Sequence, residues 1–168
     1  GLVTSDRAGE WCLGDWCGPN ILYPDKDITA SNQQMILPAP MVNTYFMVKS
    51  LEKMCEIANI IGKAEDIPEY TQKINYRKEV IEAAYFNKFD NNFIMNAQGA
   101  NAFAVDIGLG SPKTYSNLVR YYTKLGYYDT GIFGTDILTR VLFENGDAEL
   151  AVDVMTNNGT QGYEHWRR

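Results

Sequence analysis

The chain has 168 residues, enough for one domain of ordinary size, and its 45% apolar content can supply a buried core. The net charge is −6 and no Lys/Arg cluster stands out, which argues against a nucleic-acid partner. Apolar stretches are short and interrupted by charge, so the sequence predicts no membrane span.

Residues 1–35 form the first distinct region and read as irregular. They combine four glycines and two prolines with a polar run at 29–34. A structureless stretch of this length is uncommon in a compact domain, and long ordered loops are usually functional. We therefore expect residues 1–35 to form a loop beside a cleft.

Helical periodicity begins after this loop. Apolar residues at steps of three and four predict a helix over 42–61, with Gly62 at its C-terminal cap. A second helix should run from Asp66, as N-cap, to Tyr85. Residues 86–94 predict a short β-hairpin with its turn at 90–92.

Four shorter helices are expected at about 98–109, 113–125, 131–144 and 147–157, separated by Gly, Pro and Asn-Gly punctuation. Six helices joined by short turns predict an all-α fold over residues 36–168, built from three consecutive αα-hairpins with one short β-hairpin. No repeat of fixed period is present, which argues against an idealised solenoid.

The segment from Glu10 to Cys17 holds two tryptophans and two carboxylates. An indole face can stack on the apolar face of a sugar ring, while a carboxylate accepts its hydroxyl hydrogen bonds. Trp11, Asp15 and Trp16 are therefore candidate sugar contacts. In the alternative reading, the tryptophans plug the core and Asp15 caps a helix.

Two further segments could serve a binding site. The amides of Gln98 and Asn101 lie among small residues, where they could bind a ligand or cap closely packed helices. The Gly-rich segment 129–135 precedes a helix and could bind an anion, but it lacks the Lys and the spacing of a P-loop.

The C-terminal residues Glu164, His165 and Trp166 place an acid beside a base among aromatics, which suggests acid/base chemistry. Adjacent side chains point in different directions, however, and chain ends are often poorly ordered. The three cysteines and one histidine do not make a zinc site, so we expect no metal and no cofactor.

Several motifs in this order resemble the catalytic domain of bacterial α-L-rhamnosidases (glycoside hydrolase family 78). They are Trp-Cys-Leu-Gly-Asp-Trp at 11–16, Gln-Gly-Ala-Asn-Ala-Phe at 98–103, Thr-Gly-Ile-Phe-Gly-Thr at 130–135 and Gly-Asp at 146–147. The Gly-Asp-Trp and Thr-Gly-x-x-Gly-Thr pieces are the most specific. The resemblance covers most of the chain.

This resemblance implies an (α/α)6 toroid, of which the chain would be the C-terminal half. It also implies inverting hydrolysis of terminal α-L-rhamnosyl linkages by two carboxylates. The acidic, Arg-containing motif that holds the family's general acid does not occur here. Glu164 aligns with the family's general base in one alignment, whereas in the ungapped one the chain stops before it. We therefore expect the isolated chain to be inactive.

On the same basis Glu164 is the only catalytic candidate, and the sugar-contact candidates are Trp11, Asp15, Trp16, Gln98, Asn101, Phe133, His165 and Trp166. The expected partner is a rhamnose-containing oligosaccharide or glycoside. Self-association is expected through apolar flanks of helices 42–61 and 147–157, left uncovered in a half-toroid. Breakdown of sugar polymers favours a periplasmic or extracellular parent protein. The alternatives are a noncatalytic carbohydrate-binding helical domain and a helical scaffold for protein partners.

Overall fold

A computed structural model describes residues 1–4, 14–16 and 37–157. In this part of the chain the main helices are α1 (Ala39–Ile60), α2 (Ile67–Tyr85), α3 (Ala100–Asp106), α4 (Pro112–Leu125), α5 (Ile132–Glu144) and α6 (Ala148–Thr156). Two 3-10 segments, η2 (Ala64–Asp66) and η3 (Ile94–Gly99), and two short strands, β1 (Phe86–Asn87) and β2 (Asn92–Phe93), complete the described elements.

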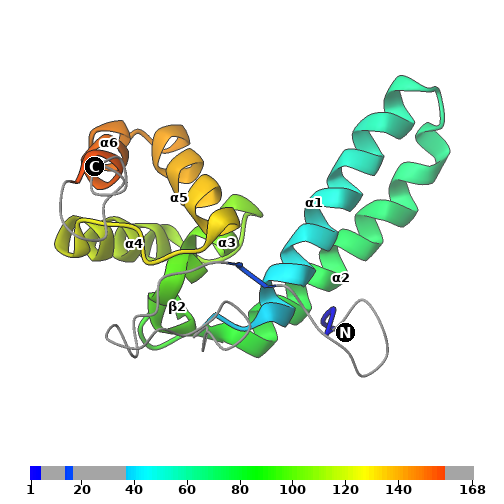
Figure 1. Ribbon diagram of the computed structural model, residues 1–168. Coiled ribbons are helices and arrows are strands. Elements are labelled where there is room, and N and C mark those ends of the chain that lie inside the picture. The colour runs from blue at the N-terminus through cyan, green and yellow to red at the C-terminus, as the bar shows by residue number, and fades with distance from the viewer. Residues whose placement is uncertain (5–13, 17–36, 158–168) are drawn as a thin grey trace.

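The helices pair in chain order. Figure 1 shows α1 and α2 as a long hairpin that projects from a compact group formed by α3 to α6. Within that group α3 packs against α4 and α5, and α6 packs against α4 and α5. The all-α prediction of consecutive αα-hairpins with one short β-hairpin is confirmed.

Local sequence explains most helix ends. Gly62 follows α1 with φ of +73°, and Gly126 ends α4 with φ of +75°, a left-handed conformation that glycine adopts without a Cβ penalty. Pro112 begins α4, where its missing N–H costs nothing. The expected Asp66 cap is not formed: its backbone is already helical and its side chain makes no capping bond, because η2 leads directly into α2.

Buried asparagines hold the β-hairpin against the helices. The Oδ1 atom of Asn92 accepts from the Nδ2 atoms of Asn101 and Asn117, at 3.0 and 2.8 Å. Asn101 also donates to the Thr114 carbonyl and accepts from the Phe93 N–H. These bonds join β2, α3 and α4 into one unit.

The core centres on α3, whose residues from Ala100 to Ala104 are fully buried. Their small side chains allow α4 and α5 to approach closely. Phe103 adds the main apolar volume and makes an edge-to-face contact with Tyr45 of α1, with ring centroids 5.0 Å apart. The short α3 thus connects the projecting hairpin with the compact group.

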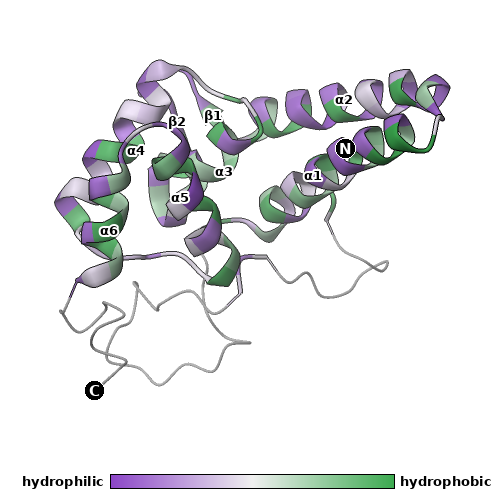
Figure 2. Cartoon of the chain, turned by 90° about the horizontal axis from the view of Figure 1, so that it is seen from above, coloured by the Kyte–Doolittle hydropathy of each residue, from purple (hydrophilic) through white to green (hydrophobic). Residues whose placement is uncertain are grey.

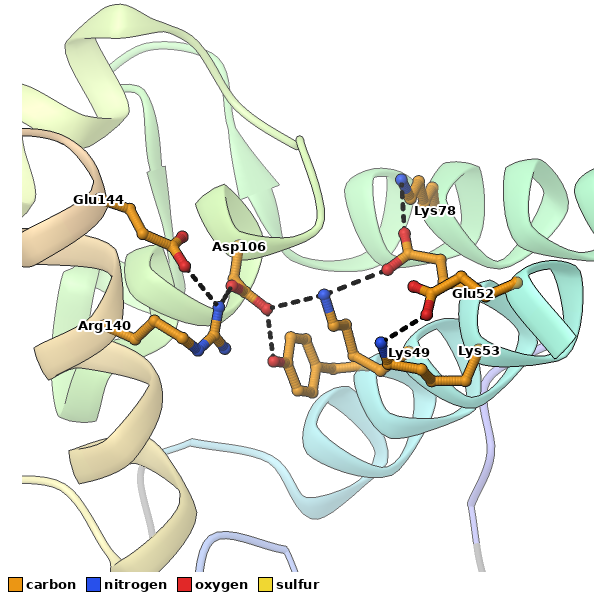
Figure 3. Close-up of polar contacts among 9 residues, drawn as sticks. Lys49, Glu52, Lys53, Lys78, Asp106, Arg140 and Glu144 are labelled. Atoms are coloured by element: carbon orange, nitrogen blue, oxygen red, sulfur yellow. Dashed lines mark hydrogen bonds and ion pairs between the residues drawn. The ribbon is translucent and has the colours of Figure 1, made fainter. Parts of the chain in front are cut away.

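A polar chain strengthens the same junction (Figure 3). The Asp106 carboxylate, only 2% exposed, accepts from Tyr45 of α1 and from Arg140 of α5 and pairs with Lys49 at 3.4 Å. Burial alone would raise the pKa of Asp106, but the bonds from Arg140 and Tyr45 and the charge of Lys49 hold it below its usual value. The anion therefore stabilises the packing of α1 against α3 and α5.

Apolar side chains are also exposed on several helices, among them α1 and α6, with Ile132 and Phe143 exposed on α5. On α1 and just beyond it they are Phe46, Met47, Met54, Ile57, Ile60 and Ile61, and on α6 they are Val152 and Met155. Figure 2 shows green segments recurring along α1 to its far end. Both helices for which an uncovered flank was expected thus carry exposed apolar side chains, and self-association through them stays a prediction.

Candidate functional site

Residues 14–16 are docked on the N-terminus of α5, more than 100 positions away in sequence. The Asp15 carboxylate accepts from the backbone N–H groups of Gly131, Phe133 and Gly134, at 2.6, 3.0 and 2.9 Å. The carbonyl of Trp16 accepts from the N–H of Ile132 at 2.8 Å.

These four donors are the groups that the start of a helix leaves without intrahelical partners. The first bond of the regular helix follows at once, from the Thr135 N–H to the Gly131 carbonyl at 3.0 Å. Two consecutive residues of a distant segment thus cap α5 completely. The Gly-rich segment 129–135, which could bind an anion by its sequence, binds the chain's own Asp15.

The glycines of both motifs have a steric role in this contact. A Cβ atom at Gly131 would lie 2.6 Å from Asp15 Oδ1, and one at Gly134 would lie less than 3.0 Å from Asp15 Oδ2. Gly14 has φ of +63° and would bring a Cβ to 3.0 Å from the Cβ of Ala39. Gly-Asp-Trp and Thr-Gly-x-x-Gly-Thr are therefore the two halves of one packed junction.

Asp15 is completely buried, with an exposed fraction of 0%. Burial raises the pKa of its carboxyl above the usual value. The three backbone donors lower this pKa in part, whereas the repulsion from nearby Asp129 raises it further. Both carboxylate oxygens face backbone donors. This arrangement favours the helix-capping reading of Asp15, while contact between Asp15 and a sugar stays a prediction.

A second buried carboxylate, Asp129, lies just before the cap. It is 1% exposed and accepts from the hydroxyls of Tyr121 and Tyr122, at 2.7 and 2.5 Å, and from the backbone N–H of Gln98 at 3.1 Å. Burial and the bond to Asp129 raise the pKa of Tyr121, so this hydroxyl stays protonated and keeps donating. Sequence reasoning treated Asp129 only as part of a backbone loop and missed this role.

The segment η3 has an unusual backbone. Ile94, Met95, Asn96 and Gln98 all have positive φ, between 45° and 61°, which is uncommon for residues other than glycine. Such strain persists only where the surroundings enforce it. Here the bond from Gln98 to Asp129 and a bond from the Leu37 N–H to Gln98 Oε1, at 2.9 Å, hold the segment.

The candidate amides are therefore buried within the structure. Gln98 is 1% and Asn101 is 0% exposed. Asn101 uses its oxygen and its nitrogen in the bonds to Phe93, Asn92 and Thr114. Their geometry favours the close-packing alternative, and sugar contacts by these two amides stay predictions.

Trp16 differs from these residues because 44% of its surface is exposed. Ile132, whose backbone N–H donates to the Trp16 carbonyl, is 55% exposed. Half-buried Phe133 packs edge-to-face on Phe46 of α1, with ring centroids 5.0 Å apart. Trp16 is thus no core plug. Phe46 was not a sequence candidate, because helical periodicity gives no sign that α1 reaches the start of α5.

Three of the candidate segments meet in the described residues: Asp15 and Trp16 contact α5, and Gln98 bonds Asp129 in the loop that precedes it. Trp11, Glu164, His165 and Trp166 lie outside the described residues. Within the described ranges, no group of three or more His, Cys, Asp or Glu side chains is placed to hold a metal ion. The same ranges contain no helix that is both long and apolar enough to cross a membrane.

Comparisons with known proteins identify the domain type. The family model described as the bacterial alpha-L-rhamnosidase 6 hairpin glycosidase domain matches residues 3–168. Comparison with curated protein sequences gives no match.

Three solved structures share the fold. The native α-L-rhamnosidase of Aspergillus terreus has a TM-score of 0.82 at 16% identity, covering 99% of this chain and 20% of that one. The enzyme of Dictyoglumus thermophilum has 0.75 at 17% identity, covering 92% of this chain and 17% of that one. The Streptomyces avermitilis enzyme complexed with L-rhamnose has 0.70 at 21% identity, covering 92% and 14%. The chain thus spans a fifth or less of these proteins, and it belongs to the family of bacterial α-L-rhamnosidase six-hairpin glycosidase domains.

Proposed function

We propose that this chain is part of a glycoside hydrolase that removes terminal α-L-rhamnosyl groups, and that Trp16 supplies a stacking face for the sugar. The observation that carries the proposal is the half-exposed indole of Trp16, fixed to a rigid helix start inside a domain of the rhamnosidase family. A second aromatic contact, between Phe133 and Phe46, lies at the same helix start.

The electrostatics of this helix start favour a neutral ligand. A free helix N-terminus attracts anions such as phosphate through its unpaired N–H groups and its dipole. Here Asp15 and the Trp16 carbonyl already occupy all four of those donors. An exposed aromatic face beside a neutralised helix end suits a sugar ring better than a phosphorylated ligand.

The chemistry in this proposal is inversion by two carboxyl groups. One protonates the leaving oxygen, and the other activates water on the opposite face of the ring, at a separation of about 6.5–9.5 Å. Asp15 and Asp129 are unsuited to either role. Both are buried, and their carboxylate oxygens already accept hydrogen bonds from backbone N–H groups or tyrosine hydroxyls. Glu164 is the candidate base within the chain, with Trp11, His165 and Trp166 as further sugar contacts.

The test uses Trp16→Ala in the complete gene product, with an aryl α-L-rhamnoside as substrate. Covering about 100 Å² of indole at about 25 cal/mol/Å² sets an upper limit of about 2.5 kcal/mol on the stacking contribution. Because the sugar hydroxyls are also desolvated, we expect KM to rise about tenfold, or about 1.4 kcal/mol. The exposed residue Phe89, on the β-hairpin turn, provides a control as Phe89→Ala.

Two outcomes would contradict the proposal. An unchanged KM in Trp16→Ala would remove the stacking role. A complete gene product that binds rhamnosides without hydrolysing them would favour the noncatalytic carbohydrate-binding alternative. We expect the 168-residue chain alone to give no turnover, because loss of one catalytic carboxyl group removes a factor of about 10²–10⁴.

A further inference from the structure

We infer that Asp15 is a positioning residue that fixes the Trp16 indole for sugar stacking through the N-terminus of α5. The inference rests on the proposed function, since it assigns Trp16 a sugar to stack on. It differs from a direct sugar contact by Asp15, which the sequence alone suggested.

The first step is the rigidity of the attachment. Asp15 is held by three backbone bonds through its carboxylate, and Trp16 by one through its carbonyl, all to consecutive N–H groups of one helix start. Because α5 packs against α3 in the core, this platform is anchored to the packed part of the domain. The backbone from which the indole projects is therefore fixed in position and direction.

The second step is that the tripeptide also contacts α1. Gly14 approaches Ala39 so closely that a Cβ atom at Gly14 would lie 3.0 Å from the Cβ of Ala39. Residues 14–16 are thus set between the start of α1 and the start of α5. The position of the Trp16 ring depends on both contacts, and Asp15 supplies the larger number of bonds.

The third step is the requirement for a carboxylate. All three atoms that face Asp15 are N–H donors, so both terminal atoms of the side chain must be acceptors. An asparagine of the same size would turn its NH2 group either toward Gly131 or toward Phe133 and Gly134. Either orientation places a donor against a donor and pushes the segment away from the helix.

The experiment compares Asp15→Asn, Trp16→Ala and the double variant in the complete gene product, with steady-state kinetics on an aryl α-L-rhamnoside. We expect Asp15→Asn to raise KM about five- to tenfold with less than a twofold change in kcat. The double variant should have the KM of Trp16→Ala alone, since Asp15 acts through the indole. If Asp15→Asn does not fold, Asp15→Ser keeps one capping acceptor and is judged by the same criteria.

Two carboxylates serve as controls. Asp136→Asn removes an exposed charge from the same helix and should leave KM unchanged. Asp147→Asn alters a partly buried, hydrogen-bonded carboxylate that joins the start of α6 to Tyr115 of α4, away from α1 and from the start of α5, so it should lower stability without raising KM. A KM rise in Asp147→Asn as large as that in Asp15→Asn would mean that general destabilisation explains the effect, and would overturn the inference.

A spectroscopic readout separates this inference from the proposed function. In protein labelled with 5-fluorotryptophan, the Trp16 fluorine resonance is the one missing from Trp16→Phe. Asp15→Asn should shift or broaden this resonance, and Asp136→Asn should not. A shifted resonance with normal kinetics in Trp16→Ala would reject the stacking function and retain the positioning role. An unshifted resonance, or a double variant whose KM losses multiply, would reject positioning.

Discussion

Gly134→Ala tests the packing of the two motifs most directly. Gly134 lies in the first turn of α5, where alanine would normally stabilise a helix by about 1 kcal/mol relative to glycine. Its added Cβ would lie less than 3.0 Å from Asp15 Oδ2 and 2.9 Å from the Cβ of Thr130. Since Thr130 and the carboxylate are both held by hydrogen bonds, the new methyl group must displace one of them.

The expected cost follows from what the displaced carboxylate loses. Asp15 Oδ2 accepts from Gly131, and a shift that clears the methyl group also weakens the bond from Gly134 itself. Two charge-assisted bonds at about 1.5–3 kcal/mol each give about 3–6 kcal/mol, from which the helix preference of alanine subtracts about 1 kcal/mol. We expect Gly134→Ala to lower the free energy of unfolding by about 3 kcal/mol, a large share of the usual 5–15 kcal/mol.

The assay is urea unfolding of the 168-residue chain, followed by far-UV circular dichroism, in a double-mutant cycle with Asp15→Ala. Without the carboxylate, the main clash disappears, so Gly134→Ala should cost about 1 kcal/mol or less and the coupling energy should be about 2 kcal/mol. Gly146→Ala is the control: a Cβ there meets no atom within 4 Å, so its cost should add to that of Asp15→Ala. Additive costs for the Gly134 and Asp15 changes would refute the proposed contact.

Two further predictions concern the junction of α1 and the exposed helix flanks. Asp106→Asn should lower the free energy of unfolding by about 1.5–3 kcal/mol at pH 7. Because the pKa of Asp106 is depressed in the folded state, its contribution to wild-type stability is present above about pH 4 and is lost as the pH falls further. The free energies of unfolding of the wild type and Asp106→Asn should therefore converge in acid. A stability difference independent of pH would contradict this. The isolated chain should self-associate through the apolar residues of α1. The double variant Ile57→Lys/Ile61→Lys should shift its sedimentation toward that of a monomer. The control Phe89→Lys, on the exposed β-hairpin turn, should leave the sedimentation unchanged. A wild-type chain that is monomeric at all concentrations would contradict this expectation.

Local sequence was sufficient for the helices and their order. Helices expected at 113–125, 131–144 and 147–157 occur at Pro112–Leu125, Ile132–Glu144 and Ala148–Thr156, because Pro, Gly and Asn-Gly signals lie within a few residues of the ends they set. The helix expected at 98–109 is shorter at both ends, because residues 98–99 belong to η3 and α3 ends at Asp106. Positive φ at Gln98 is enforced by Asp129 and Leu37, and such distant partners leave no local signal.

The candidate site shows the same limit more clearly. The residue types in Gly-Asp-Trp allowed two readings of Asp15, and no local pattern could choose between them. The choice depends on four backbone N–H groups at the start of α5. They donate to the Asp15 carboxylate and the Trp16 carbonyl, which lie 116 to 119 positions earlier in the sequence. The exposure of Trp16 likewise depends on how α1 and α5 are placed, which periodicity within each helix does not define.

One physical requirement explains why these two motifs occur together. A buried carboxylate costs several kcal/mol unless donors surround it, and a helix start carries four such donors with a favourable dipole. The backbone N–H groups can approach the Asp15 carboxylate only where no Cβ atom blocks the approach. This requires glycine at positions 131 and 134. The carbonyl of the next residue, Trp16, accepts from the same helix start, and its side chain is exposed there. A large aromatic residue at this place is thereby held at the surface by the same bonds that bury its neighbour, as Trp16 is.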